Sequence, residues 1–353
     1  MVFCFMLEDF MEELRQNDRR AIVLFTTGLF VLVTIFLLNI MLGAVSVSLT
    51  DVINSFFEPE TVEKASRNII LKIRLPRAMA AIASGACLAL SGLLLQVFFN
   101  NPIVEPYILG VSSGANLVLA IVLLGGYTFG MGTVSSMGLF LGAFLGAMLV
   151  MLIVIFASQK VKSVTSLLII GLMMGYVCSA VTSVLTAFAD KEKLSGFTVW
   201  TMGSFSGFTW QSVKILYLMT ILFLIISFFM CKPLNALLLG ESYAQSMGIA
   251  IKPFRLLIVL VASVLTAAVT AFAGPIAFIG LAVPHIVRLI FKTSNHQITL
   301  PATCILGGIM AGICDLGARL LFAPTELPIS AITSLIGAPL VISMLVRKQG
   351  GEW

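Results

Sequence analysis

The sequence predicts an all-helical membrane protein that crosses the bilayer about ten times, and three observations support this fold class. Hydrophobic residues make up 59% of the 353 positions, and only 10% are charged. Soluble domains are roughly 45–50% apolar and 25% charged. The apolar residues also occur in runs of about 20, the length that an α-helix needs to cross the hydrocarbon core. Such a chain cannot cover a water-facing surface, so lipid is its expected solvent.

The apolar runs define ten candidate membrane spans. Their approximate bounds are 21–42, 76–98, 106–125, 135–157, 164–188, 211–230, 254–273, 275–290, 299–322 and 327–346. The span 275–290 is short and contains Pro284, so we expect a broken or partly inserted helix, which is tolerated where protein or a cavity surrounds it. An even number of spans places both termini on one side of the membrane.

Basic residues indicate that this side is the cytoplasm. Residues 1–20 carry mixed charge, and the apolar run that follows is too long for the core of a signal peptide. We therefore predict a cytoplasmic N-terminal segment followed by a first span, with no cleavable signal. Positive residues recur in the connections that then lie inside, as the positive-inside rule requires. They include Lys160, Lys232, Lys252, Arg255, Arg288, Lys292, Arg347 and Lys348.

One external connection departs from this rule. Residues 43–75, with the helix that follows, contain Lys64, Arg67, Lys72, Arg74 and Arg77. Long connections are translocated whatever their charge. That explanation and a binding role both stay open for the first two of these residues.

Several patterns that carry chemistry in other proteins do not occur in this sequence. The six cysteines stand singly, without a Cys-x-x-Cys pair, which argues against a zinc site or a disulfide framework. There is no Gly-x-x-x-x-Gly-Lys-Ser/Thr loop to cradle a nucleotide triphosphate. We therefore expect no catalytic residue, no metal, no cofactor and no nucleic-acid partner for this chain. Energy for any transport must come from another subunit.

The longest predicted cytoplasmic connection follows the sixth span. Leu234, Leu237 and Leu238 recur there at helical spacing, Gly240 interrupts the pattern, and a second short amphipathic segment ends at Gly248. The pattern predicts two short helices joined by a glycine. Exposed leucines in such a loop need a groove on a partner to bury them. A helix lying on the lipid surface is the alternative.

Two kinds of titratable residue lie in or near the predicted spans. Asp315 is inside the ninth span, four residues before Arg319. An intramembrane acid is a candidate functional group, but an ion pair at this spacing satisfies both residues, and we favour that interpretation. We expect His285, after Pro284, to be a hydrogen-bonded structural residue, and His296 to be a loop residue without an assigned role.

Eight segments then occur in a distinctive order. They are Arg74-Leu75-Pro76-Arg77, Asn101-Pro102-Ile103-Val104-Glu105-Pro106, Gly110-Val111-Ser112-Ser113-Gly114-Ala115, the stretch from Leu239-Gly240-Glu241 to Gly248, the stretch from Gly274-Pro275 to Pro284-His285, Asp315-Leu316-Gly317-Ala318-Arg319, Glu326-Leu327-Pro328 and Ile336-Gly337-Ala338-Pro339. In order and spacing, from about residue 70 to 347, the chain resembles the FecCD/BtuC-like permease family of bacterial ATP-binding-cassette (ABC) importers for iron–siderophore, haem or cobalamin. Residues 1–70 match only as one span and a loop.

The resemblance implies a single transmembrane permease domain over residues 1–353, of the type II importer kind, in the bacterial inner membrane. It implies a homodimer with the pathway at its two-fold axis, two cytoplasmic ATPase subunits and an external substrate-binding protein. The expected cargo is an iron(III)–siderophore, with haem or cobalamin as the other possibilities. Residues 232–252 are then the coupling loop that docks into the ATPase. Its candidate residues are Leu237, Leu238, Gly240, Glu241 and Gly248.

The resemblance also implies a role for three external arginines. Arg74, Arg77 and Arg319 match positions where acidic residues of the binding protein dock. A planar guanidinium suits this role because it holds a carboxylate with two parallel hydrogen bonds. Snorkelling to lipid headgroups is the alternative from the residues alone.

Two other classes of protein fit parts of the sequence. An ion-coupled secondary transporter needs acids or histidines in mid-membrane, and here Asp315 and Glu105 are the candidates. An intramembrane serine hydrolase is suggested by Gly-x-Ser-x-Gly at residues 110–114, with His285 as a base. That motif carries chemistry on a strand-to-helix elbow, whereas here it opens a predicted membrane helix, so we disfavour it.

Overall fold

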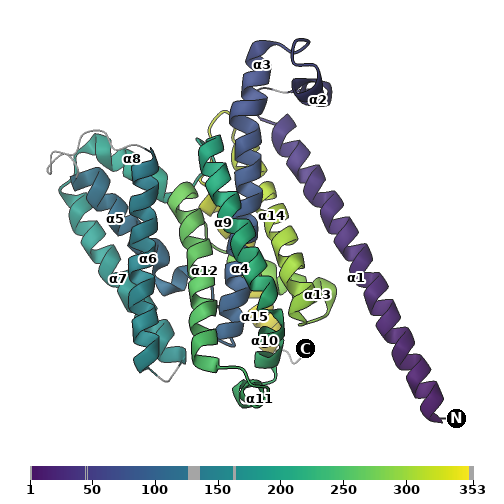
Figure 1. Cartoon of the computed structure of the whole chain (residues 1–353). Coiled ribbons are helices and arrows are strands. Elements are labelled where there is room, and N and C mark those ends of the chain that lie inside the picture. Colours follow the sequence, from purple (N-terminus) through teal and green to yellow (C-terminus); the bar gives the residue numbers. More distant parts are fainter. Residues whose placement is uncertain (1, 44, 46, 126–135, 162–163, 350–353) are drawn as a thin grey trace.

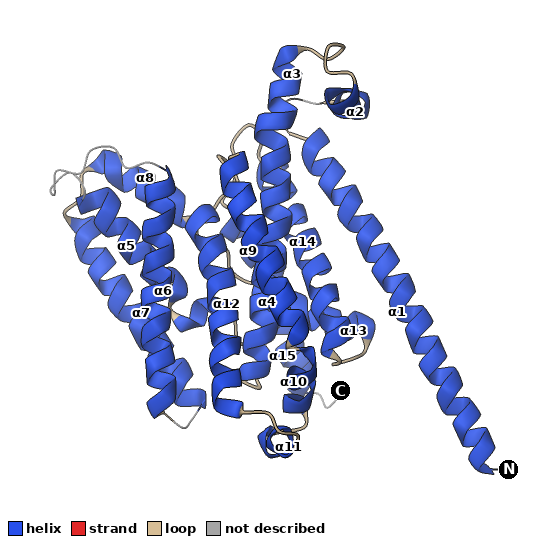
Figure 2. Cartoon of the chain, viewed as in Figure 1, coloured by secondary structure: helices blue, strands red, loops and turns tan. Residues whose placement is uncertain are grey.

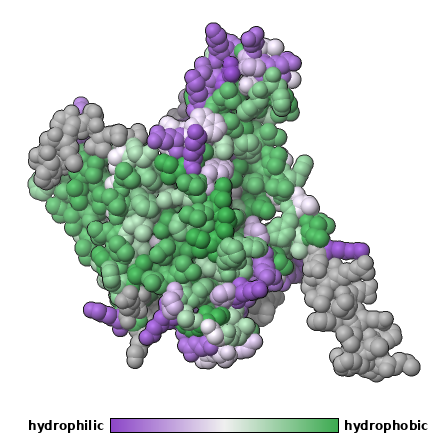
Figure 3. Space-filling model, viewed as in Figure 1, coloured by the Kyte–Doolittle hydropathy of each residue, from purple (hydrophilic) through white to green (hydrophobic). Residues whose placement is uncertain are grey.

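The computed structural model describes residues 2–43, 45, 47–125, 136–161 and 164–349, and all regular structure in these residues is helical (Figure 1, Figure 2). On the face shown in Figure 3, hydrophobic side chains form a broad band across the middle of the bundle, and hydrophilic side chains gather at its upper and lower ends. This distribution is that of a protein whose middle faces lipid. The predicted fold class, an all-α membrane protein with many spans, is confirmed.

The helices follow one another with short connections. In chain order they are α1 (Val2–Met41), α2 (Leu49–Phe57), α3 (Lys64–Asn68), the π-helix η1 (Ile69–Arg74), α4 (Leu75–Phe98), the 3-10 helix η2 (Pro106–Leu109), α5 (Val111–Gly125), α6 (Ser136–Lys160), α7 (Val164–Ala187), α8 (Lys191–Thr201), α9 (Trp210–Phe229), α10 (Cys231–Leu238), α11 (Glu241–Ser246), α12 (Ile251–Ala273), α13 (Ile279–Phe291), α14 (His296–Leu320) and α15 (Ile329–Gln349).

Among the described residues, seven helical stretches are long and apolar enough to cross a membrane. They contain α1, the continuous run α3–η1–α4, α6, α7, α9, α12 and α14. Three shorter apolar helices, Val111–Leu124, Ile279–Phe291 and Ile329–Ser343, lie where the sequence predicted the remaining spans. The count of ten crossings stays a prediction, as does the orientation of the termini.

Helix α4 is the centre of the bundle, and its small residues bring neighbouring backbones close. A Cβ built on Gly85 lies 2.1 Å from the carbonyl oxygen of Gly307 in α14. A Cβ on Gly92 lies 1.8 Å from the carbonyl oxygen of Gly280 in α13. Glycine is therefore required at both positions, and the backbones pack directly, as small residues allow in membrane helices. This packing fixes the position of α4 along the axis of α14.

The helix is not broken at Pro284, where the sequence led us to expect a break. Helix α13 continues through Pro284, and the irregular segment precedes it, between Ala273 and Ile279. A proline removes the N–H that bonds the carbonyl four residues back, here that of Gly280. The Gln96 side chain replaces this donor: its Nε2 donates to the carbonyl oxygens of Gly280 at 3.3 Å and Leu281 at 3.2 Å. The helix survives because a neighbouring helix satisfies its freed backbone.

The predicted span 106–125 also differs at its start. Residues Pro106–Leu109 form a 3-10 turn, Gly110 takes a positive φ of 75°, and α5 begins at Val111. Ser112 is thus the second residue of α5, and the segment before it is helical. A hydrolase motif of this kind needs a turn that leads from a strand into a helix. In the described chain a 3-10 helix precedes this serine instead. The hydrolase interpretation therefore has no structural basis here.

Candidate functional site

An ionic network occupies the end of the bundle where α4 begins and α14 ends. Arg77 Nε lies 3.0 and 3.2 Å from the two carboxylate oxygens of Asp315, and its Nη2 lies 2.9 Å from Asp315 Oδ1. Its remaining terminal nitrogen, Nη1, donates to Glu326 Oε1 at 2.8 Å. The Asp315 side chain has no exposed surface, whereas that of Glu326 is 45% exposed. One guanidinium thus links α4 to α14 and to the segment before α15.

Arg319 extends this network to the end of α1. Its Nε lies 3.2 Å from Asp315 Oδ2, which is the predicted ion pair four residues apart. Its Nη2 donates to the Asn39 side-chain oxygen at 2.7 Å and to the Asn39 carbonyl at 3.2 Å, and its Nη1 donates to the Leu42 carbonyl at 3.2 Å. The ion pair of Asp315 with Arg319 is therefore confirmed. The second partner of Asp315, Arg77, was missed.

Arg74 is used in a different way. Its Nη1 donates to the carbonyl oxygens of Ile40 at 2.9 Å and Met41 at 2.7 Å, and its Nη2 donates to that of Val45. These are carbonyls at and beyond the C-terminal end of α1, which attract cations. Arg74 therefore caps α1 from the side.

The three arginines are buried in the isolated chain. Arg74, Arg77 and Arg319 are 5%, 7% and 8% exposed. Docking of an external protein onto them stays a prediction. Other basic residues of the segment between α1 and α4 are exposed at this end of the molecule. They line a shallow groove of about 370 Å³ formed by Lys64, Arg67, Asn68, Leu71 and Lys72.

The opposite end carries the predicted two-helix loop. Helices α10 and α11 are separated by Gly240, as the sequence predicted, and α11 projects from the lower end of the bundle in Figure 1. Gly240 has φ 105° and ψ 156°, a conformation that is essentially restricted to glycine. Gly248, which ends the second helix, has φ 84°. These glycines set the angle at which α11 leaves α10.

The leucines of this loop do not all need a partner. Leu234 is fully buried, and Leu237 is half-buried against the core. The expectation that both lack an internal core is wrong, because α10 lies along the base of the bundle. Leu238 is 47% exposed, and an apolar surface continues over its neighbours. Those neighbours are Leu239, Tyr243 and Met247.

Polar side chains tie this loop to the long helices. Glu241, in the first turn of α11, forms an ion pair with Arg255 of α12, whose guanidinium lies 5.9 Å from the ring centroid of Phe98 in α4. Asn235 of α10 holds the start of α14: its Oδ1 lies 2.8 Å from the backbone nitrogen and 2.7 Å from Nδ1 of His296.

The Asn235–His296 contact was missed by sequence reasoning, which treated His296 as a loop residue. His296 is 2% exposed and is the first residue of α14. The helix-start signal was present, because the preceding Asn295 accepts a hydrogen bond from Gln297 N as an N-cap. The α10–α11 loop thus contacts α12 through Glu241 and α14 through Asn235.

Together these features describe a helical membrane protein that has a buried ionic network at one end and an exposed two-helix loop at the other, and whose sequence lacks a nucleotide-binding loop. The model of the FecCD transport family matches residues 31–347. This chain belongs to that family of ABC importer permeases.

Individual relatives agree with this assignment. The vitamin B12 import system permease protein BtuC of Vibrio parahaemolyticus is 34% identical over 349 residues, covering 97% of this chain and 99% of the relative. The protein of the same name from Salmonella arizonae is 36% identical over 282 residues, covering 79% of this chain and 83% of the relative. A solved metal-chelate type ABC transporter in an inward-facing conformation has a TM-score of 0.80 and 32% identity, covering 92% of this chain and 99% of that chain.

Proposed function

We propose that this permease carries a bulky metal chelate, an iron(III)–siderophore or cobalamin, across the bacterial inner membrane as a homodimer with two ATPase subunits. The observation that carries the proposal is the exposed α10–α11 loop. Its apolar side chains at Leu238, Tyr243 and Met247 face outward, while Glu241 and Asn235 connect it to the long helices. A loop built in this way buries its apolar face in a partner and passes the partner's movement to the bundle.

The cargo is a proposal supported by the relatives. Two carry vitamin B12 in their names, and the solved neighbour is described as a metal-chelate type transporter. An iron(III)–siderophore was the expectation from the sequence, with haem or cobalamin as the other possibilities, and cobalamin is the second candidate here on the strength of those names. Both are large polar chelates, so the same kind of pathway suits either.

The homodimer is supported by surfaces that the single chain leaves open. Helices α7 and α9 are mostly exposed, whereas α12 is mostly buried. One face of α7 carries Tyr176, Ser179 and Ser183, all exposed. A face with small hydroxyl side chains suits a lined pathway better than hydrocarbon. We therefore assign this face of α7 to a pathway between two copies.

The cargo is tested by reconstitution with the cognate ATPase and binding protein. We expect a complex of two permease and two ATPase chains, and ATP-dependent uptake into vesicles without an ion gradient. Radiolabelled cobalamin and an iron(III)–siderophore are compared at equal concentration. Uptake that instead follows a proton or sodium gradient without ATP would support the secondary-transporter alternative. A monomer that transports alone would contradict the proposed assembly.

We also propose that the binding protein docks at the mouth formed by Arg74, Arg77 and Arg319, with Lys64 and Lys72 presenting exposed charge beside it. Two double variants separate the contributions: Arg74→Glu with Arg77→Glu, and Lys64→Glu with Lys72→Glu. Each should weaken docking and reduce its dependence on salt, because like charges then oppose an acidic partner.

Folding is monitored in both docking variants, because Arg77 is buried against two carboxylates. The lysine variant changes only exposed charge, since both lysines are exposed. Unchanged affinity in a variant that folds normally would remove that group from the docking surface. If only the arginine variant loses affinity, the partner reaches the buried guanidiniums. If only the lysine variant loses affinity, the partner contacts the exposed lysines, and the buried arginines have a structural role.

A further inference from the structure

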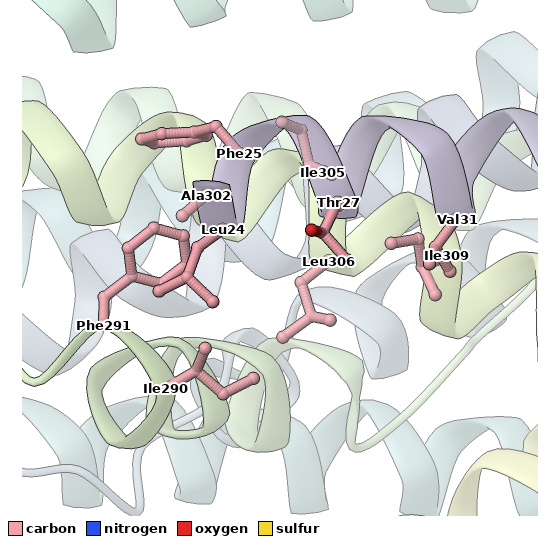
Figure 4. Close-up of a pocket in the computed structure, with 11 residues that line it drawn as sticks. Leu24, Phe25, Thr27, Val31, Ile290, Phe291, Ala302, Ile305, Leu306 and Ile309 are labelled. Atoms are coloured by element: carbon pink, nitrogen blue, oxygen red, sulfur yellow. The ribbon is translucent and has the colours of Figure 1, made fainter. Parts of the chain in front are cut away.

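A narrow apolar cleft lies between the middle of α1 and the helices α13 and α14 (Figure 4). Its volume is about 210 Å³. The lining residues are Leu24, Phe25, Thr27, Gly28 and Val31 from α1, Ile290 and Phe291 from α13, and Ala302, Ile305, Leu306 and Ile309 from α14. Thr27 carries the one side-chain oxygen among them. An apolar cavity of about 150 Å³ stays dry and takes up apolar molecules, so this cleft suits hydrocarbon.

The course of α1 creates the cleft. Helix α1 leans away from the bundle toward its N-terminal end (Figure 1). It approaches α14 closely at Gly28, where a built Cβ lies 3.4 Å from Ile305 Cγ2. Nearer the N-terminal end, the rings of Phe25 and Phe291 meet with centroids 5.1 Å apart. Between and around these contacts the two surfaces do not interlock, and Thr27 and Ile290 remain exposed.

Positive charge lies at the polar end of this cleft. Arg20 Nη2 donates to the carbonyl oxygen of Ile290, a lining residue, at 3.0 Å. Lys292 follows the lining residue Phe291 and is exposed, as are Arg19 and Arg20. The bond to Ile290 uses one of the five donors of the Arg20 guanidinium. The N-terminal end of α1 is on the same side of the bundle as α11 (Figure 1).

An apolar slot with cations at its polar end has the chemistry of an anionic phospholipid. Basic pockets between membrane helices bind anionic headgroups, and each nearby Lys or Arg strengthens the attraction. We propose that the cleft holds one acyl chain of an anionic phospholipid and that its phosphate lies against Arg19, Arg20 and Lys292. The lipid then fills the gap between α1 and the bundle. This inference does not depend on which cargo the permease carries.

The test uses the delipidated full-length chain in detergent, titrated with phosphatidylglycerol, phosphatidylcholine or inorganic phosphate and followed by native mass spectrometry and thermal unfolding. We expect phosphatidylglycerol to bind roughly tenfold more tightly than phosphatidylcholine and to raise the unfolding midpoint. Inorganic phosphate alone should do neither at equal concentration. Equal affinity for the two lipids, or an equal effect of phosphate alone, would overturn the proposal.

Two variants locate the site. Arg19→Gln with Lys292→Gln removes two charges and keeps the Arg20 anchor, so phosphatidylglycerol affinity should fall by about tenfold or more. Gly28→Leu places a side chain in the cleft and should weaken binding of both lipids. The matched controls, Lys191→Gln with Lys193→Gln and Gly196→Leu, lie on α8 and should bind as the parent does.

Three further results would count against the site. Unchanged binding in the charge variant would exclude these cations, and unchanged binding in Gly28→Leu would place the acyl chain elsewhere. If dimerisation, measured by light scattering, displaces the lipid and Gly28→Leu abolishes dimerisation, the occupant is a second copy of the chain.

Discussion

At the scale of single residues, the stability of the ionic network depends on how its buried charges compensate one another. Asp315 has no exposed surface and lies within ion-pair distance of both Arg77 and Arg319. Transfer of a charge from water into a protein interior costs several kcal/mol, roughly, which only close partners and hydrogen bonds repay. Each of these arginines also contacts an oxygen outside the pair, from Glu326 or Asn39. Removal of any one charged residue therefore leaves another buried charge without its partner.

Replacement of Asp315 by alanine should destabilise the fold strongly. It leaves two buried guanidiniums without their shared carboxylate, and breaking a buried pair costs about 3–5 kcal/mol. The unfolding midpoint in detergent measures the effect. Asp190→Ala is the control, because this exposed acid pairs with Lys193 at the surface, at 2.9 Å. It should leave the midpoint unchanged. Equal midpoints for the two variants would show that the buried network contributes nothing to stability.

Part of this network was predictable from sequence. Asp315 and Arg319 are four apart on one helix, so their pairing follows from helical geometry. The contact with Arg77 joins residues 238 positions apart. It depends on the backbone approach of Gly85 to Gly307, which sets α4 against α14. Spacing along the chain does not tell how far α4 is shifted along its axis relative to α14. The contact of Arg77 with Asp315 could therefore not be predicted, and the arginines were expected at the surface.

At the scale of whole elements, α13 illustrates how a helix tolerates an internal proline. Gln96 of α4 donates to the carbonyls of Gly280 and Leu281, and its oxygen accepts from Arg288. The sequence indicated a disturbed helix at Pro284 because proline lacks a backbone donor. It did not indicate that a side chain from another helix supplies the missing bond.

A double-mutant cycle tests this repair. Gln96→Leu should cost about 1–3 kcal/mol, because it leaves a buried carbonyl without a donor. In a Pro284→Ala background the cost should be smaller by about 1 kcal/mol, since the substituted alanine restores the N–H that bonds the Gly280 carbonyl. Unfolding free energies of the four proteins give the coupling. Strictly additive costs would mean that Gln96 acts through Arg288 and not through the helix backbone.

The α10–α11 loop depends on a second special position, Gly240. Its φ of 105° and ψ of 156° cost about 1–3 kcal/mol for other residues. Gly240→Ala should therefore change the angle between the helices and lower cargo-stimulated ATP hydrolysis and uptake together. Gly196→Ala is a close control, because nothing lies within 4 Å of a Cβ at either glycine and only Gly240 has positive φ. Full activity in Gly240→Ala would remove this loop from coupling.

At the scale of the whole molecule, lipid and pathway surfaces have to be told apart, because a single chain exposes both. The sequence located the long apolar helices well, since apolar runs of membrane length are a property of the chain alone. It did not show which faces meet lipid. The exposed face of α7 carries Ser179 and Ser183, whereas α6 exposes Leu145 and Leu149. The exposed surface of α7 also includes Met173, Val177, Val181 and Val184, so the two serines are what distinguishes it from the exposed surface of α6.

Water access distinguishes the two surfaces directly. Charged thiosulfonate reagents modify the thiolate, which forms in water and not in hydrocarbon. In the assembled importer, Ser179→Cys should therefore react about tenfold or more faster than Leu145→Cys, each corrected for the parent protein. Ser179 lies eight residues before the end of α7, and Leu145 lies nine residues after the start of the preceding helix α6, so depth in the membrane does not explain a difference. Saturating cargo-loaded binding protein should slow the reaction at position 179. Equal rates at both positions, with or without cargo, would place α7 against lipid and move the pathway to another helix.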